Sequence, residues 1–157
     1  FLIYFKEIIN ININIMDFDK FVKGEINTHI CKNLILEIIN ASQLVFEILG
    51  TGFSEHIYHR SLEIELRKRQ ILYETKRILP IDYCGINVGF AEADIIINGE
   101  FVVELKALSN PPRESEVSQV MTYLNAINKD HGIVINFPQA GKDIARDKID
   151  FLLVDRE

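Results

Sequence analysis

The sequence predicts an α/β fold with a mixed central sheet flanked by helices. Two observations lead to this class. Two long helical patterns come first and are followed by antiparallel strand patterns rich in β-branched residues. One further helical pattern then precedes two more strands. The order helix, helix, antiparallel strands, helix, strand, strand favours a mixed sheet with helices packed on it.

Composition sets limits on the function. A chain of 157 residues with 48% hydrophobic and 25% charged residues is typical of one soluble globular domain. The net charge of −6 argues against broad electrostatic binding of nucleic acid. It does not exclude a metal-bridged active site, whose carboxylates themselves add negative charge. Two cysteines fit a reducing compartment, so we expect a cytoplasmic protein, and no segment approaches the length of a membrane span.

Residues 1–15 differ from the rest of the chain. They begin without Met, lack the marks of a secretory signal, and alternate as Ile-Asn-Ile-Asn-Ile, a pattern typical of a strand. Met16 followed by Asp17 resembles a natural start. We therefore expect residues 1–15 to be a non-native or extra N-terminal extension, and residues 16–157 to form one domain. An additional edge strand is the alternative interpretation of residues 1–15.

The two leading helices are predicted from apolar spacing. The first runs from Glu25 to Leu49 and ends at Gly50. The second begins after Ser54, a suitable N-cap, and ends near Gln70. Its expected buried side comprises Ile57, Tyr58, Ser61, Leu62, Ile64 and Leu66.

The later elements are separated by turn residues. Pro80 places the first strand, Leu72–Tyr83, at an edge or a bend of the sheet. The pair Pro111-Pro112 separates the strands from the third helix. The expected elements after the first strand are strand Val88–Ile97, helix Arg113–Asn128, strand Gly132–Phe137 and strand Phe151–Val154.

The stretch 93–106 carries the chemistry. Two apolar runs flank Asn98-Gly99, which indicates a β-hairpin. Asp94 lies in the first run, and Glu104 and Lys106 lie in the second. Charged side chains among buried neighbours are costly unless they are paired, hydrogen-bonded or bound to metal. A solvent-facing stripe on a half-buried hairpin is the alternative interpretation.

The turn decides between these two interpretations. A two-residue turn at Asn98-Gly99 pairs Asp94 with Val103 and leaves Glu104 on the opposite face. An odd loop, a type I turn followed by a glycine bulge, makes Asp94 face Val102 instead. Asp94, Glu104 and Lys106 then share one face. A functional cluster therefore requires an irregular turn, and we predict one.

Two further patterns accompany the hairpin charges. Residues 52–58 read G-x-x-E-x-x-Y, and residues 119–123 read Q-x-x-x-Y, whose ends share one helical face. Together with Asp94 and the triplet Glu104-Leu105-Lys106, they resemble the GxxExxY protein family, a branch of the PD-(D/E)xK nuclease-like superfamily. The resemblance runs from about Leu34 to Phe137.

The resemblance implies a restriction-endonuclease-like core with a divalent metal, Mg²⁺ or Mn²⁺. It implies that Glu55, Asp94 and Glu104 hold the metal and that Lys106 orients or activates the attacking water. Gln119 and Tyr123 match a motif that shapes the active site and contacts the substrate. The sequence departs from the family at Glu92, where a basic residue is expected.

The residue types suit this chemistry. Mg²⁺ prefers hard oxygen ligands, and a bound metal polarises a phosphoryl oxygen while a lysine offsets developing negative charge. Each residue also has a structural interpretation. Glu55 favours the helix dipole, Lys106 pairs with Glu104 or Glu92, and the Q-x-x-x-Y residues form a polar cap on a packed helix.

Two hypotheses follow from the sequence. The first is a metal-dependent nuclease that hydrolyses phosphodiester bonds, with nucleic acid as its partner and DNA expected over RNA. The second is a non-catalytic member of the same fold that binds nucleic acid or a protein partner. Intact acidic and lysine positions favour the first, whereas Glu92 and the net charge favour the second.

Overall fold

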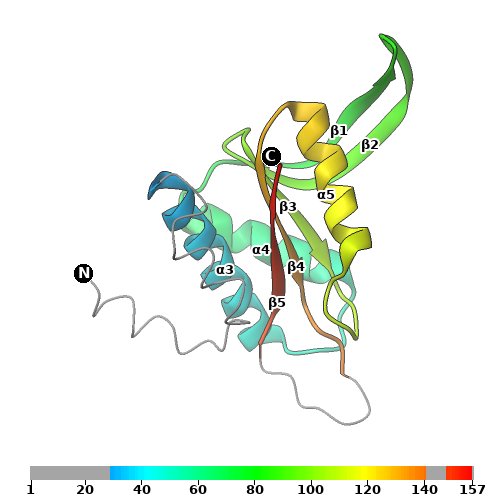
Figure 1. The fold of residues 1–157 in the computed structure, drawn as a ribbon. Coiled ribbons are helices and arrows are strands. Elements are labelled where there is room, and N and C mark those ends of the chain that lie inside the picture. Colours follow the sequence, from blue (N-terminus) through cyan, green and yellow to red (C-terminus); the bar gives the residue numbers. More distant parts are fainter. Residues whose placement is uncertain (1–28, 141–147, 157) are drawn as a thin grey trace.

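The computed structural model describes residues 29–140 and 148–156 (Figure 1). The described elements follow the predicted order. They are α3 (His29–Leu49), α4 (Glu55–Lys68), β1 (Tyr73–Tyr83), β2 (Ile86–Ile97), β3 (Phe101–Lys106), α5 (Glu114–Ile127), β4 (His131–Asn136) and β5 (Asp150–Asp155). Residues 1–15, the predicted helical start at residues 25–28, and the loop around Gly141 lie outside the described residues.

The five strands form one sheet in the order β1-β2-β3-β4-β5. The pairs β1/β2, β2/β3 and β4/β5 are antiparallel, whereas β3 and β4 are parallel. Parallel neighbours need a crossover, and α5 supplies it between β3 and β4. The predicted mixed sheet is therefore confirmed.

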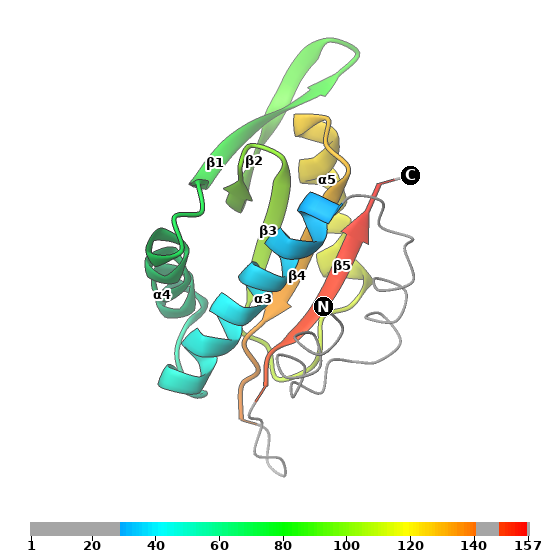
Figure 2. The ribbon, with the colours of Figure 1, turned by 90° about the vertical axis from the view of Figure 1, so that its left-hand side faces the viewer.

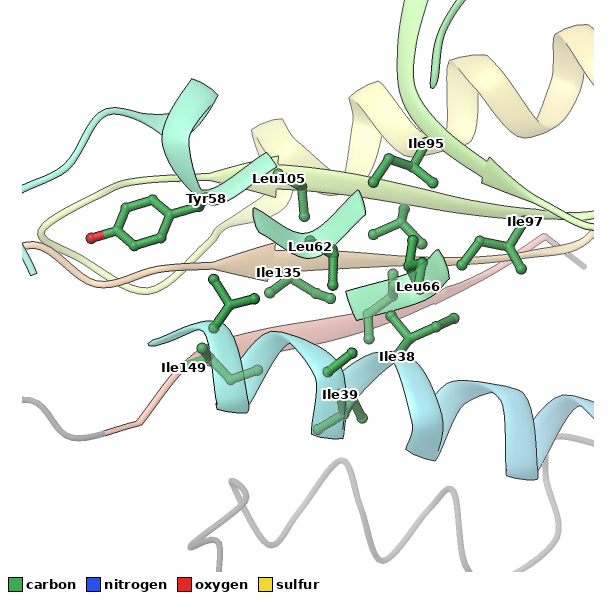
Figure 3. Close-up of a cluster of buried hydrophobic side chains, with 14 of the residues drawn as sticks. Ile38, Ile39, Tyr58, Leu62, Leu66, Ile95, Ile97, Leu105, Ile135 and Ile149 are labelled. Carbon is green, nitrogen blue, oxygen red and sulfur yellow. The ribbon is translucent and has the colours of Figure 1, made fainter. Parts of the chain in front are cut away.

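Helices cover both faces of the sheet (Figures 1 and 2). Helices α3 and α4 pack on one face, where Leu62 and Leu66 of α4 meet Ile95 and Leu105 of the sheet (Figure 3). Helix α5 packs on the other face, largely through Val120 and other apolar residues. Each fully buried aliphatic side chain stabilises the fold by about 1.5–3 kcal/mol.

The predicted end of the first helix is confirmed. Gly50 has a φ of +70°, and its N–H donates to the carbonyl oxygen of Phe46 at 2.7 Å. A positive φ favours glycine, which carries no Cβ, at this position.

The buried side of α4 differs in part from the prediction. Tyr58, Leu62 and Leu66 are buried as expected, but Ile57 and Ile64 are 39% and 46% exposed. The helix instead buries polar residues, namely His59, Glu63 and Glu65. These polar residues are hydrogen-bonded or ion-paired, which removes most of the cost of burying them.

Strand β1 lies at the edge of the sheet, as Pro80 predicted. Strands β1 and β2 pair along most of their length, with interruptions at Lys76/Asp94 and between Ile81 and Asp82, and their far end projects beyond the body of the protein as a long hairpin (Figure 1). The hairpin exposes several large apolar side chains, which are distributed over its two faces. These side chains are Ile78, Tyr83, Ile86, Val88 and Phe90.

The turn between β2 and β3 is irregular, as predicted, but its register is not the predicted one. Ile97 pairs with Phe101, which leaves a three-residue loop, Asn98–Glu100. Asn98 and Gly99 have positive φ values, of 53° and 69°. A type I turn requires negative φ at both central residues, so the predicted type I turn is wrong. Ile95 pairs with Val103, so the same register continued by one residue sets Asp94 opposite Glu104. The predicted pairing of Asp94 with Val102 is therefore also wrong.

No helix in the described part of the chain is long and apolar enough to cross a membrane.

Candidate active site

The candidate site lies where β2 separates from β3. The two strands pair only from Ile95 to Ile97 and from Phe101 to Val103. Beyond Ile95, β2 continues along β1, whereas β3 continues along β4. We call this separation the fork. Its charged residues are Lys76, Asp94, Glu104 and Lys106, and we call them the fork cluster.

Asp94 bridges the opening of the fork. Its carboxylate oxygen Oδ2 accepts a hydrogen bond of 2.9 Å from the backbone N–H of Leu105 on β3. The other oxygen, Oδ1, is bonded to the ammonium group of Lys76 on β1. Asp94 is 5% exposed, so these contacts replace almost all of its hydration.

Glu104 and Lys106 project from the same side of β3. Lys106 Nζ donates to Glu104 Oε1 at 2.6 Å. The second oxygen, Glu104 Oε2, is buried and has no hydrogen-bond partner among the described residues. Burial, followed by the charge of Asp94, raises the pKa of Glu104 to about 7 against the attraction of Lys106. The predicted grouping of Asp94, Glu104 and Lys106 is confirmed.

Glu55 lies at the first position of α4 and interacts with the fork cluster through its charge. Burial raises the pKa of its carboxyl group, the charge of Lys106 lowers it, and the charge of Asp94 raises it again. The first turn of a helix also favours a carboxylate there. The helix dipole and proximity to the fork therefore both act on Glu55.

The other residues of G-x-x-E-x-x-Y hold the start of α4 in place. Gly52, at a φ of +97°, donates its N–H to Gln139 Oε1 at 3.0 Å. Tyr58 donates its hydroxyl to the carbonyl of Gly50 at 2.7 Å and stacks on Phe137 with ring centroids 4.4 Å apart. The motif thus divides into two anchoring residues and one carboxylate that they position.

Gln119 and Tyr123 lie on α5, one turn apart. Gln119 Nε2 donates to Tyr123 Oη at 2.6 Å. Burial raises the pKa of Tyr123, and the charges of Glu104 and Asp94 raise it further against the hydrogen bond from Gln119. The charges of the fork cluster therefore act on the Tyr123 hydroxyl.

Two residues near Asp94 were missed by the sequence analysis. Lys76 contacts Asp94 directly, and His59 on α4 places Nδ1 3.9 Å from Asp94 Oδ1. Burial lowers the pKa of His59, and the charge of Asp94 opposes this change. His59 lies one helical turn after Glu55, which is a signal that the sequence contained.

Glu92 faces a basic residue. Its carboxylate oxygen Oε1 lies 3.5 Å from Lys76 Nζ, and its side chain is 49% exposed. Lys76 comes from the neighbouring strand. The positive charge that the family resemblance expects at residue 92 is therefore present nearby on β1.

Asn136 shapes the loop that follows Lys106. It is fully buried, and its Oδ1 accepts the N–H of Leu108 at 2.7 Å. Its Nδ2 donates to the carbonyl of Leu108 and to Asp150 Oδ2. The Ile135-Asn136-Phe137 ending thus has a structural role next to the site.

The donor atoms of the fork determine whether a divalent cation fits there. Among the described residues, no group of three or more His, Cys, Asp or Glu side chains is arranged to hold a metal ion. Asp94 and Glu104 each contact a lysine ammonium group instead. The unpartnered, buried Glu104 Oε2 is nevertheless a hard oxygen donor of the kind that Mg²⁺ and Mn²⁺ prefer. The carboxylate oxygens of Asp94 and Glu104 therefore suit such a cation in kind, although the described residues are not arranged around one.

The fold and the fork define a class of protein. The model of the PD-(D/E)XK nuclease superfamily matches residues 32–147. The chain belongs to this superfamily, and the restriction-endonuclease-like fold predicted from the sequence is confirmed. Members generally use divalent metal ions.

One solved structure, titled "Crystal structure of SSO0001", is similar to this chain at 25% sequence identity and a TM-score of 0.49. The match covers 64% of this chain and 48% of that protein, so this chain spans about half of its length. No curated protein matches the chain.

Proposed function

We propose that this protein is a metal-dependent nuclease that hydrolyses nucleic-acid phosphodiester bonds. The observation that carries the proposal is the meeting of Asp94, Glu104 and Lys106 at the fork, with one buried carboxylate oxygen left unpartnered. A buried acceptor without a partner costs about 1–3 kcal/mol, which a protein rarely retains without use. The superfamily match supports the same chemistry.

Each residue has a distinct role in this proposal. Asp94 and Glu104 hold Mg²⁺ or Mn²⁺, and Glu55 completes the ligand set. When bound, the ion supplies a Lewis acid and lowers the pKa of coordinated water. Lys106 provides positive charge where the phosphoryl group gains negative charge. Gln119 and Tyr123 shape the substrate side of the site.

Assignment within the superfamily is part of the proposal. We propose that the chain is a GxxExxY protein, because Gly52, Glu55 and Tyr58 each have a separate task in the structure. DNA is proposed over RNA as substrate, and residues 16–157 as one domain preceded by the extension 1–15. A cytoplasmic location agrees with the exposed free thiol of Cys84.

Cleavage assays test the proposal. Labelled single- and double-stranded DNA and RNA are incubated with Mg²⁺, Mn²⁺ or EDTA. We expect cleavage that requires the cation, is abolished in Glu104→Gln and Lys106→Ala, and leaves part of the nucleic-acid binding intact. Lys129→Ala is the matched control, because this lysine pairs with Glu100 away from the fork. Equal cleavage by wild type and both fork variants would locate the activity elsewhere.

The second candidate is a non-catalytic module that binds nucleic acid or a protein partner. The exposed apolar side chains of the β1–β2 hairpin, among them Ile78, Val88 and Phe90, favour this candidate, since exposed apolar patches commonly mark binding sites. In that case we expect no cleavage of any nucleic acid with either Mg²⁺ or Mn²⁺. We also expect Phe90→Ser to weaken binding of the partner. Ile48→Ser, at an equally exposed position on α3, is the control.

A further inference from the structure

Lys76 has an unusual backbone for a lysine within a strand. Its φ is +49°, in the left-handed region that non-glycine residues seldom adopt. Thr75 and Arg77 pair with Ile95 and Ala93 in the β1/β2 ladder, but Lys76 and Asp94 between them are not paired. Such strain persists only where surrounding contacts impose it, and it concentrates at functional sites.

Thr75 provides the contacts that fix this conformation. Its hydroxyl donates to Glu63 Oε1 at 3.0 Å and lies 2.8 Å from His59 Nε2. Glu63 and His59 both lie on α4 and are 5% and 3% exposed. The residue before Lys76 is therefore tied to a buried polar network. That network holds β1 so that Lys76 reaches Asp94.

Lys76 and Asp94 differ greatly in exposure. The side chain of Asp94 is 6% exposed, whereas that of Lys76 is 45% exposed. An ammonium group that is half in water loses little on leaving its partner, because solvent takes over its solvation. Asp94 cannot regain water in this way and needs another cation in exchange. Of the two residues, Lys76 is therefore the one that can leave the ion pair when another cation binds Asp94.

We propose that Lys76 is an exchangeable counter-ion, which neutralises Asp94 in the metal-free protein and turns to a substrate phosphate when a divalent cation takes its place. This inference rests on the proposed nuclease function. It also accounts for the departure at Glu92, because Lys76 carries the basic charge that the family expects there. The carboxylate of Glu92, 3.5 Å from Lys76 Nζ, keeps the lysine close to the site.

Direct Mn²⁺ binding, measured by calorimetry without nucleic acid, tests the exchange. We expect Lys76→Met to bind Mn²⁺ about fivefold more tightly than wild type, because a competing, partly exposed ion pair is gone. Lys76→Arg should restore the competition. Arg77→Met should bind as wild type does, since the adjacent Arg77 pairs with Glu74. Lys76→Gly also removes the ammonium group and suits the positive φ, in case the Met variant folds poorly.

Salt-dependent binding of a DNA oligonucleotide tests the second half of the proposal. All variants carry Lys106→Ala to prevent cleavage. With Mn²⁺, Lys76→Met should reduce the slope of log K against log salt by about 0.7–0.9, the value of one phosphate contact. In EDTA the slopes should coincide, because Lys76 then remains on Asp94.

The outcomes separate this inference from the proposed function. Unchanged or weaker Mn²⁺ affinity in folded Lys76→Met, with Mn²⁺ binding lost in Glu104→Gln, would overturn the exchange and leave the nuclease proposal standing. Equal salt slopes in Mn²⁺ would overturn the phosphate contact. A wild-type protein that binds no Mn²⁺ at millimolar concentration would overturn both.

Discussion

Replacing Glu104 with glutamine distinguishes a functional fork from a structural one. Glu104 is 2% exposed, and its pKa is raised from 4.5 to about 7, chiefly by burial and then by Asp94. The folded protein therefore binds a proton here more readily than the unfolded chain does. The free energy of unfolding must then fall as pH rises from about 4.5 to 7. The full loss is about 3 kcal/mol.

Glutamine cannot ionise, so the Glu104→Gln variant does not suffer this loss. Part of the gain is offset, because the new amide donor has no partner where Glu104 Oε2 now lies, at a cost of about 1–3 kcal/mol. We expect the variant to be about 1 kcal/mol more stable than wild type at pH 8. At pH 5, where wild-type Glu104 is largely protonated, it should be about 1–2 kcal/mol less stable.

Urea unfolding in EDTA at pH 5 and pH 8 measures both values. Glu65→Gln is the matched control on α4. Hydrogen bonds from Lys68 and then Arg69 lower the pKa of Glu65, so this residue is ionised at both pH values. Its replacement should therefore destabilise the protein to a similar extent at pH 5 and pH 8.

A loss of about 3–5 kcal/mol in Glu104→Gln at pH 8 would refute the reasoning, because that is the cost of breaking a stabilising buried ion pair. Manganese gives a second readout. At about 100 times its Kd it should stabilise wild type by about 2.7 kcal/mol and leave Glu104→Gln nearly unchanged.

Three further predictions concern the elements around the fork. Gly132→Ala should cost about 1–3 kcal/mol in chemical unfolding, because the added Cβ would lie 2.6 Å from Val120 Cγ1 and displace α5; an unchanged midpoint would contradict this packing. Tyr123→Phe removes the acceptor of the Gln119 hydrogen bond and should reduce the cleavage rate while leaving the free energy of unfolding nearly unchanged. A loss of cleavage that is matched by a loss of stability would indicate a structural role only. A chain that starts at Met16 should keep its thermal midpoint, and a large decrease would show that the preceding residues belong to the sheet.

The grouping of Asp94 with Glu104 could be predicted because it depends only on whether the number of residues in the loop is odd or even. Side chains alternate along a strand, so any loop with an odd number of residues puts these carboxylates on one face. The predicted register and the observed one differ by two positions and therefore give the same faces. The register itself could not be predicted, since Asn98 and Gly99 both tolerate positive φ and therefore suit more than one turn.

The polar residues of α4 could not be predicted by the same means. Ile57 and Ile64 have the spacing of a buried stripe, yet both remain partly exposed. The helix is rotated so that His59 and Glu63 face β1, where the hydroxyl of Thr75 satisfies them. Apolar periodicity carries no information about a hydrogen-bond partner on another element. Lys76 was missed for the same reason, since its strained backbone depends on that partner.

The two lysines of the fork are not equivalent, and the difference bears on how the site works. Lys106 is 18% exposed and pairs with Glu104 along one strand, so its ammonium group stays beside the carboxylate that it serves. Lys76 is 45% exposed and reaches Asp94 from the outer strand. Together they balance two buried negative charges without a metal, which lets the fold form before the cation binds. Only the more exposed lysine can leave at low cost, and its departure opens Asp94 next to the unpartnered oxygen of Glu104. The cation is thus proposed to bind at the place that the Lys76 ammonium group vacates.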